Sequence, residues 1–126
     1  MAVRGVGVDA VDVDRFTRIL ERRPRLLDRL FQPLEREQCA ERPDRLAARF
    51  AAKEAAWKAL GVGLGATGWR DVSVELDDAG APHLRVTGRA AHLAAERGVT
   101  AWHVSLSHTD TTAVAVVIAE EQHRAG

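Results

Sequence analysis

The chain has 126 residues, 46% of them hydrophobic, which is enough to form a core without disulfides or a structural metal. Its 18 Lys and Arg residues balance its 18 Asp and Glu residues, so no net charge favours nucleic acid or an anionic membrane as a partner. The longest apolar run, residues 112–119, is too short to span a bilayer, and the N-terminus shows no signal-peptide core.

Cysteine usage points to a reducing compartment. Cys39 is the single cysteine, so it cannot form an internal disulfide, and no Cys/His cluster has zinc spacing. Neither a repeat nor a linker divides the chain. We therefore expect one cytoplasmic domain over residues 1–126, without nucleic-acid or membrane partners.

The first half of the chain predicts one strand followed by helices. Residues 2–9 read as a short strand, and residues 14–23 have helical periodicity. Three prolines each precede helix-forming residues, a position that tolerates their fixed φ: Pro24, Pro33 and Pro43. The last and longest helix is expected over residues 44–60 and ends at a glycine-rich loop.

The second half predicts mainly strands. Residues 71–76 and 83–86 alternate around a turn, and residues 88–98 read as a short helix. Residues 101–108 and 112–120 read as a final hairpin. The fold class is therefore α+β, with a small antiparallel sheet packed against the long helix.

The long helix has an apolar stripe and almost no polar surface. Lys53 lies within that stripe, whereas Glu54 and Lys58 lie side by side on its flank. The stripe consists of Leu46, Phe50, Trp57 and Leu60. A carboxylate in crowded surroundings needs a positive partner, and Lys58, four residues after Glu54, is the simplest one. Taken alone, this pair is best explained as structural.

A second carboxylate ends the first strand. Gly5, Gly7 and Asp9 share one strand face by period two, so a ligand or another backbone can approach that face closely. Together with the helix carboxylate, Asp9 could hold Mg²⁺, which prefers oxygen ligands. Alternatively Asp9 caps the next helix, although Asp12 and Asp14 are better placed to do so.

The glycine loop after the long helix matches a common motif in the wrong context. Gly63, Gly65 and Gly68 satisfy G-x-G-x-x-G, but the loop follows a helix and precedes a strand, so a dinucleotide fold is rejected. Phosphates could still approach this loop if cations such as Lys58 or Arg70 offset the negative end of the helix dipole, which lies at the helix C-terminus.

Two separated motifs now coincide with a known family. Residues 6–9 read Val-Gly-Val-Asp, and residues 50–58 read Phe-Ala-Ala-Lys-Glu-Ala-Ala-Trp-Lys. The chain resembles the holo-acyl-carrier-protein synthases, the small group of 4′-phosphopantetheinyl transferases, in which both motifs occur in this order. The resemblance extends over nearly the whole chain and is weakest between residues 21 and 45.

The resemblance implies transfer of the phosphopantetheine arm of coenzyme A to a serine of an apo acyl carrier protein, with release of 3′,5′-ADP. It implies that Asp9 and Glu54 ligate Mg²⁺, and that Lys58 stabilises or protonates the leaving oxygen. A lysine can act as an acid when its pKa is lowered, which arginine cannot do. Glu54 and Glu35 remain alternative bases for the serine.

Further contacts follow from the same resemblance. It places Arg15 against the carrier protein, and Arg42 or Arg45 could join Arg49 at the 3′-phosphate. The residues that it assigns to coenzyme A are Arg49, Lys58, Gly61, Gly63, Gly65, Pro82, His108 and Thr109.

The final strand suggests assembly. Residues 112–119 are apolar on both faces, which predicts burial against another subunit as well as against the chain's own helices, with Val117 placed in the interface. The short members of the family form trimers, so we expect a homotrimer with sites between subunits.

Two other functions remain open at this point. A non-catalytic α+β module could use Asp9, Glu54 and Lys58 as a buried ion cluster. A Mg²⁺-dependent phosphohydrolase would keep the metal and use water as the nucleophile. The chain has 16 Arg but only two Lys, Lys53 and Lys58, both within the second motif, and this bias favours a specific role for an ammonium group.

Overall fold

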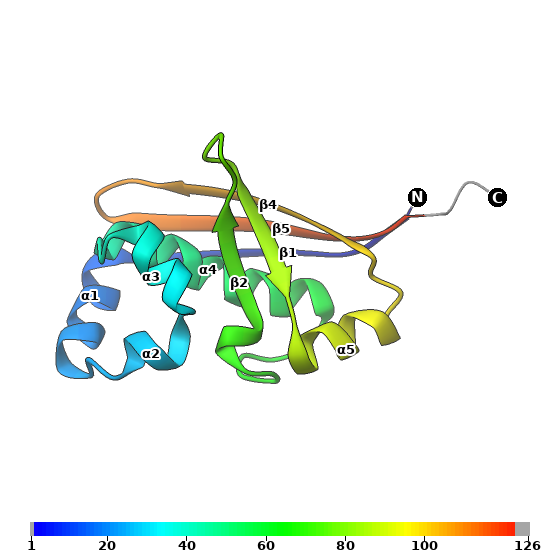
Figure 1. Cartoon of the computed structure of the whole chain (residues 1–126), viewed down its shortest axis with the longest axis horizontal. Coiled ribbons are helices and arrows are strands. Elements are labelled where there is room, and N and C mark those ends of the chain that lie inside the picture. Colours follow the sequence, from blue (N-terminus) through cyan, green and yellow to red (C-terminus); the bar gives the residue numbers. More distant parts are fainter. Residues whose placement is uncertain (1, 123–126) are drawn as a thin grey trace.

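The computed structural model describes residues 2–122 and has the expected α+β order (Figure 1). Its elements are β1 (Ala2–Asp12), α1 (Val13–Arg22), α2 (Leu26–Leu30), α3 (Pro33–Cys39), α4 (Pro43–Leu60), a 3-10 turn (Trp69–Asp71), β2 (Val72–Leu76), β3 (Pro82–Val86), α5 (Gly88–Glu96), β4 (Ala101–His108) and β5 (Thr112–Glu121). No helix within residues 2–122 is both long and apolar enough to cross a membrane.

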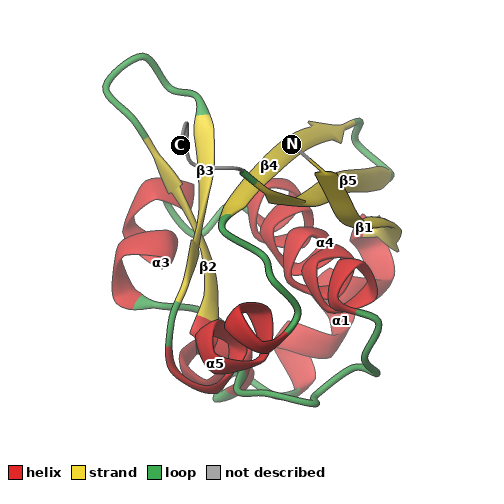
Figure 2. Cartoon of the chain, turned by 90° about the vertical axis from the view of Figure 1, so that its right-hand side faces the viewer, coloured by secondary structure: helices red, strands yellow, loops and turns green. Residues whose placement is uncertain are grey.

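The strands form two antiparallel sheets, not the single sheet that the sequence suggested. One sheet has the order β1-β5-β4, and the other is the separate β2–β3 hairpin. Figure 2 shows the hairpin loop standing away from the three-stranded sheet. The alternation of polar and apolar residues along residues 71–86 predicted the hairpin correctly. Such a local pattern does not indicate which sheet the hairpin joins.

The first strand is longer than expected. It continues past Asp9 to Asp12, because Val8 to Asp12 remain in register with Val116 to Thr112 of β5. Asp9 is therefore held within the strand, and Asp12 takes the role of helix cap. Its side chain accepts a hydrogen bond from the Arg15 backbone N–H at 2.9 Å.

Helix α4 packs against one face of the three-stranded sheet, and glycines allow the contact. A Cβ atom added to Gly5 or Gly7 would lie 1.8 Å from the carbonyl oxygen of Ala59 or Ala55. Only residues without a side chain fit there. The strip that the sequence left open is thus occupied by the backbone of α4, which fixes β1 directly on the helix.

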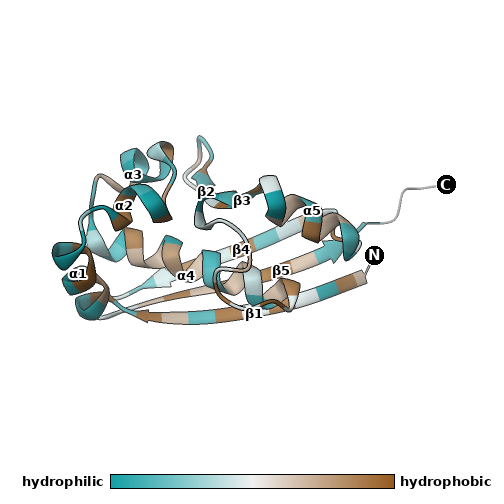
Figure 3. Ribbon diagram, turned by 90° about the horizontal axis from the view of Figure 1, so that it is seen from below, coloured by the Kyte–Doolittle hydropathy of each residue, from teal (hydrophilic) through white to brown (hydrophobic). Residues whose placement is uncertain are grey.

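The two faces of the three-stranded sheet differ sharply. Toward α4, β5 presents four fully buried side chains, namely those of Ala113, Ala115, Val117 and Ala119. On the opposite face, Val6 and Val8 of β1 are 57% and 51% exposed. Their partners in register are Ile118 and Val116, so apolar residues continue across two strands on this outer face. Figure 3 shows the hydropathy of the residues along β1 and β5.

Candidate active site

The Lys58 ammonium joins α4 to β1 at the centre of the candidate site. It donates to Asp9 Oδ1 at 2.9 Å and to the Val8 carbonyl oxygen at 3.1 Å. An ammonium has three donors, so one remains for a ligand. The ion pair of Lys58 therefore crosses to the strand, whereas the sequence had paired it with Glu54 along the helix.

The negative neighbour changes the acidity of the lysine. Hydrogen bonding and charge attraction from Asp9 raise the pKa of Lys58 above its usual value. Lys58 is therefore protonated and positively charged at neutral pH. This favours charge stabilisation over proton donation, because an efficient acid needs a pKa near the working pH.

Glu54 shares the site with Asp9. Burial, followed by hydrogen bonding and charge repulsion from Asp9, raises the pKa of Glu54 to about 7, and Lys58 opposes this shift. Two carboxylates in one place repel each other unless a proton or a cation lies between them. A divalent cation fits this pair on chemical grounds, since Mg²⁺ commonly takes one or two carboxylates and completes its shell with phosphates and water.

Within residues 2–122, no group of three or more His, Cys, Asp or Glu side chains could hold a metal ion. A cation at Asp9 and Glu54 would therefore draw its other ligands from a substrate or from water. A cation held by only two carboxylates would keep open positions, unlike the cation of a closed structural site.

The raised pKa of Glu54 predicts a pH effect on stability. The folded-state pKa, about 7, lies above the ordinary value of 4.5, so folding favours the protonated form of Glu54. The free energy that an ionised Glu54 costs the fold therefore grows as pH rises between those two values. In metal-free buffer at pH 8 we expect Glu54→Gln to stabilise the fold by roughly 1 kcal/mol, after a discount for partial exposure. At pH 4 the gain should vanish. Denaturant melts at the two pH values measure this, and an equal change at both would contradict it.

A groove runs from Glu54 to α1. It has a volume of about 430 Å³ and includes the side chains of Arg15, Phe16 and Ile19 on α1 with Phe50 on α4. Arg15, expected at a carrier protein, therefore lines the same groove as Glu54. The groove combines apolar side chains with the charged side chains of Asp12, Arg15 and Glu54.

A second group of expected residues lies against the β2–β3 hairpin. Arg49 is buried and donates to the Val74 carbonyl oxygen at 2.8 Å and to Gln38 Oε1 at 3.1 Å. It borders a pocket of about 330 Å³ together with Arg45, Pro82 and His108. Arg49, Pro82 and His108, remote in sequence, thus meet as the sequence analysis required of a shared site.

Other expected residues have different surroundings. Gly61 has φ 73° and ends α4 in the left-handed conformation, as predicted from the glycine. Gly63 and Gly65 lie on the exposed loop with open space where a side chain would be. The Thr109 hydroxyl accepts backbone hydrogen bonds from Thr111 and Thr112, so it also shapes the β4–β5 turn.

The two groups occupy different sides of α4. Glu54 follows Arg49 by five residues, which separates them by ~140° around the helix axis. Lys58 contacts β1, whereas Arg49 contacts β2. Within one chain, the two groups of expected residues therefore lie apart.

Sequence reasoning missed a buried ion pair beside these sites. Lys53 and Glu35 are both 0% exposed, and the Lys53 ammonium donates to Glu35 Oε1 at 2.8 Å. Lys53 also donates to the Trp69 and Val72 carbonyl oxygens. The sequence did contain a signal for this ion pair, namely one lysine within an apolar stripe. A lysine that is buried with such a stripe requires a partner inside the protein.

Glu35 is consequently excluded as the base. Its second oxygen accepts from the Val74 backbone N–H at 3.0 Å, and its first also accepts from the Gln32 backbone N–H. A carboxylate enclosed by these donors and Lys53 cannot reach a substrate. Arg42 pairs with Asp44, and the same Asp44 oxygen lies 3.6 Å from His108 Nδ1, so Arg42 stays near the group of residues at the β2–β3 hairpin.

Comparison with known proteins identifies the family. A family model described as the 4′-phosphopantetheinyl transferase superfamily matches residues 5–117. The chain belongs to this superfamily. The transferase therefore has the fold class and the enzyme class that its two sequence motifs indicated.

Relatives of the transferase cover it almost completely. A holo-[acyl-carrier-protein] synthase of Streptomyces avermitilis is 54% identical over 125 residues, covering 95% of this chain and 99% of the relative. The Helicobacter pylori synthase solved with coenzyme A has a TM-score of 0.83 at 27% identity and covers 91% and 99% of the two chains. The Plasmodium yoelii synthase solved with ADP has a TM-score of 0.88 at 26% identity, with 97% and 98% coverage.

Proposed function

We propose that this single-domain transferase moves the 4′-phosphopantetheine arm of coenzyme A onto a serine of an apo acyl carrier protein and releases 3′,5′-ADP. The observation that carries the proposal is the meeting of Asp9, Glu54 and Lys58 where β1 crosses α4. The relative solved with coenzyme A supports this co-substrate. The single buried cysteine, Cys39, is compatible with action in the cytoplasm.

Asp9 and Glu54 would hold Mg²⁺, which neutralises charge on phosphate oxygens when it is bound. In the transfer, the serine oxygen bonds to the phosphorus that carries the pantetheine arm, and the bond from that phosphorus to the bridging oxygen breaks. The serine proton passes to a carboxylate. Of the two carboxylates considered as the base, Glu54 is the accessible one, because Glu35 is 0% exposed and is held by Lys53 and the Val74 backbone N–H.

Lys58 stabilises the negative charge that develops on the leaving 3′,5′-ADP. We expect Lys58→Met to lower kcat by ~10²-fold, the usual scale for losing one preorganised charge. Because the pKa of Lys58 is raised, Lys58→Arg should retain more activity than Lys58→Met. Steady-state kinetics of both variants decide the point. Equal, severe losses would instead favour a proton-donating lysine.

The outer face of the three-stranded sheet supports assembly into the proposed homotrimer. Its exposed valines on β1 and their β5 partners form one apolar surface, and such surfaces commonly mark subunit contacts. Assembly would also join the Asp9 and Glu54 side of one copy to the Arg49 and His108 side of the next. We therefore place the complete sites between subunits.

The register corrects which residue should test this interface. Val117 faces α4 and is 0% exposed, whereas Val116 points to the outer face. We expect Val116→Glu to yield folded monomers with little activity, because a charge cannot be buried unpaired between subunits. Val117→Glu should unfold the chain instead. Light scattering and circular dichroism separate these outcomes, and a fully active wild-type monomer would refute the shared sites.

The direct test of function is the intact mass of an apo acyl carrier protein after incubation with the protein, coenzyme A and Mg²⁺. We expect the carrier mass to rise by one phosphopantetheinyl group and 3′,5′-ADP to accumulate in equal amount. A carrier whose target serine is changed to alanine is the control. Coenzyme A cleavage without carrier modification would indicate a hydrolase, and no reaction at all would indicate a structural ion cluster.

A further inference from the structure

The outer face of the three-stranded sheet carries one buried carboxylate that lacks a donor. Glu120 of β5 is 6% exposed, and its Oε1 atom has no hydrogen-bond partner within residues 2–122. Its neighbours in register are Val3 of β1 and Ala101 of β4, whose side chains have no donor. A buried carboxylate oxygen without a donor costs free energy, so Glu120 needs a positive partner.

One basic side chain faces this carboxylate from the neighbouring strand. His103 of β4 is in register with Ile118, which precedes Glu120 by two residues and lies on the same face of β5. The Nε2 atom of His103 lies 3.6 Å from Glu120 Oε1, which is too long for a hydrogen bond. The His103 side chain is 54% exposed. The outer face thus places an exposed imidazole beside an acceptor that lacks a donor.

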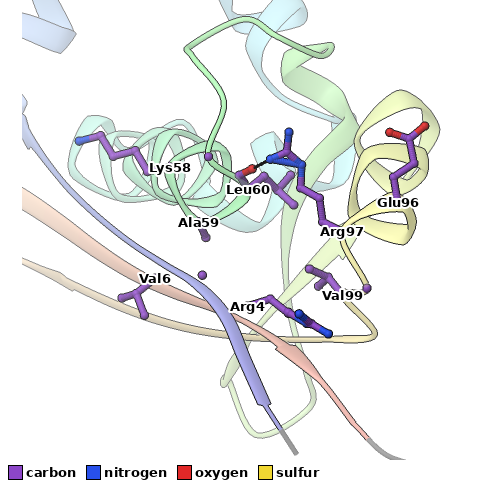
Figure 4. A pocket seen from close by; sticks show the side chains of 11 residues that line it. Arg4, Val6, Lys58, Ala59, Leu60, Glu96, Arg97 and Val99 are labelled. Carbon is purple, nitrogen blue, oxygen red and sulfur yellow. Dashed lines mark hydrogen bonds between the residues drawn. The ribbon is translucent and has the colours of Figure 1, made fainter.

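The other charged side chains of these strands do not reach this pair. Those on the opposite face, toward α4 and α5, are Arg4, Asp9, His108 and Glu121. Figure 4 shows Arg4 on that side of β1 and Val6 on the other. Asp12 shares the outer face but caps α1 at its far end. Within residues 2–122, no further charged group lies within ion-pair distance of Glu120.

A second copy of this chain is the partner that suits this face. Val3, Val6 and Val8 are 61%, 57% and 51% exposed, so the polar pair borders an apolar surface of the kind that subunits bury. The buried carboxylate disfavours an anionic partner such as nucleic acid. A copy packed on the valines would also cover His103 and exclude water from it, which strengthens the attraction between opposite charges.

On the basis of the proposed assembly, we propose that a second copy docks on this face and encloses the His103–Glu120 pair, and that docking requires the proton on His103. The protonated ring then donates to Glu120 Oε1 within the contact between copies. A neutral ring would leave the Glu120 charge enclosed without a positive partner, which is costly. The assembled state therefore holds more protons than the free chains, so assembly weakens as pH rises.

The test measures the dissociation constant of the assembly of the full-length protein by sedimentation velocity at pH 6 and pH 8.5, because imidazoles commonly lose their proton within this range. We expect wild-type assembly to be weaker at pH 8.5 by ~10-fold or more, the scale of one charge-assisted hydrogen bond. Glu120→Gln should assemble more weakly than the wild type at pH 6 and lose most of the pH dependence.

The stability of the free chain separates this role from an internal one. Urea denaturation at concentrations where the protein is monomeric should find Glu120→Gln no less stable than the wild type, because the carboxylate has no donor within the described chain. An internal ion pair would instead make the variant less stable.

Three controls test the assignment of the pair. His103→Gln should also abolish the pH dependence, and combining it with Glu120→Gln should weaken assembly little further, because each change removes the same interaction. His92→Gln removes an exposed histidine of α5 and should leave the pH dependence unchanged. A chain that ends at Gln122 should assemble as the wild type does, which excludes the last residues as the source of the donor.

Wild-type assembly that is equal at both pH values, and unchanged in folded Glu120→Gln and His103→Gln proteins, would overturn the inference while leaving the trimer and the proposed transfer intact. A Glu120→Gln monomer that is clearly less stable would overturn it as well. A wild-type protein that stays monomeric at both pH values would overturn both the pair and the shared sites, even if it modifies the carrier. If Glu120→Gln then weakens carrier binding, the face belongs to the carrier protein.

Discussion

Asp9→Asn is expected to abolish nearly all phosphopantetheinyl transfer, with a loss of at least ~10³-fold, while the protein stays folded. The change keeps the size of the side chain but removes the charge that holds Lys58 and, with Glu54, would hold Mg²⁺. Asp9 is only partly buried, so the fold does not depend on its charge. Carrier-modification rates and Mg²⁺ titration calorimetry measure the two effects.

Asp78→Asn is the matched control for this prediction, because Asp78 lies in the exposed turn between β2 and β3. It should transfer at the wild-type rate. If Asp9→Asn unfolds the protein and wild-type activity is indifferent to magnesium, the Asp9–Lys58 pair is a structural cluster and the proposed mechanism fails.

Lys53→Met should produce the largest loss of stability, about 3–5 kcal/mol, because it leaves Glu35 charged and unpaired in the interior. Burial lowers the pKa of Lys53, and Glu35 opposes that shift, so each charge depends on the other. Urea denaturation measures the free energy of unfolding. The substitution should also lower 3′,5′-ADP affinity, since the pair fixes α3 and β2 against the helix that carries Arg49.

A double substitution distinguishes loss of the pair from loss of packing. Lys53→Met combined with Glu35→Gln removes both charges and keeps an oxygen that can accept from the Val74 backbone N–H. We expect the double variant to be more stable than Lys53→Met alone. A double variant that is less stable than either single variant would show that the two charges do not compensate each other.

The helices and strands were largely predictable because their signals are local. Prolines at helix starts, Gly61 at a helix end and alternation in the strands each depend on a few neighbouring residues. The end of β1 was misplaced at Asp9, since pairing with β5, remote in sequence, extends the strand to Asp12. The division into two sheets was missed for the same reason.

The proximity of the candidate site residues was predictable, whereas their contacts were less so. The two motifs selected Asp9, Glu54 and Lys58, but the choice of Asp9 as the partner of Lys58 depends on how α4 lies on β1. Lys53 and Glu35 are 18 residues apart and meet only through tertiary packing. The prediction that Val117 lies in a subunit interface was wrong. Because both faces of β5 are apolar, the sequence does not indicate which of its residues face α4.

The contact of Gly5 and Gly7 with the carbonyl oxygens of α4 has a consequence for how sequences of this kind can diverge. The backbone of β1 contacts the backbone of α4 directly there. The distance between Asp9 and the helix therefore does not depend on the size of a side chain at these contacts. Exchanges among apolar residues elsewhere in the core can accumulate over evolutionary time without moving the carboxylates. A larger residue at Gly5 or Gly7 would instead push β1 away from α4 and move Asp9 relative to Glu54.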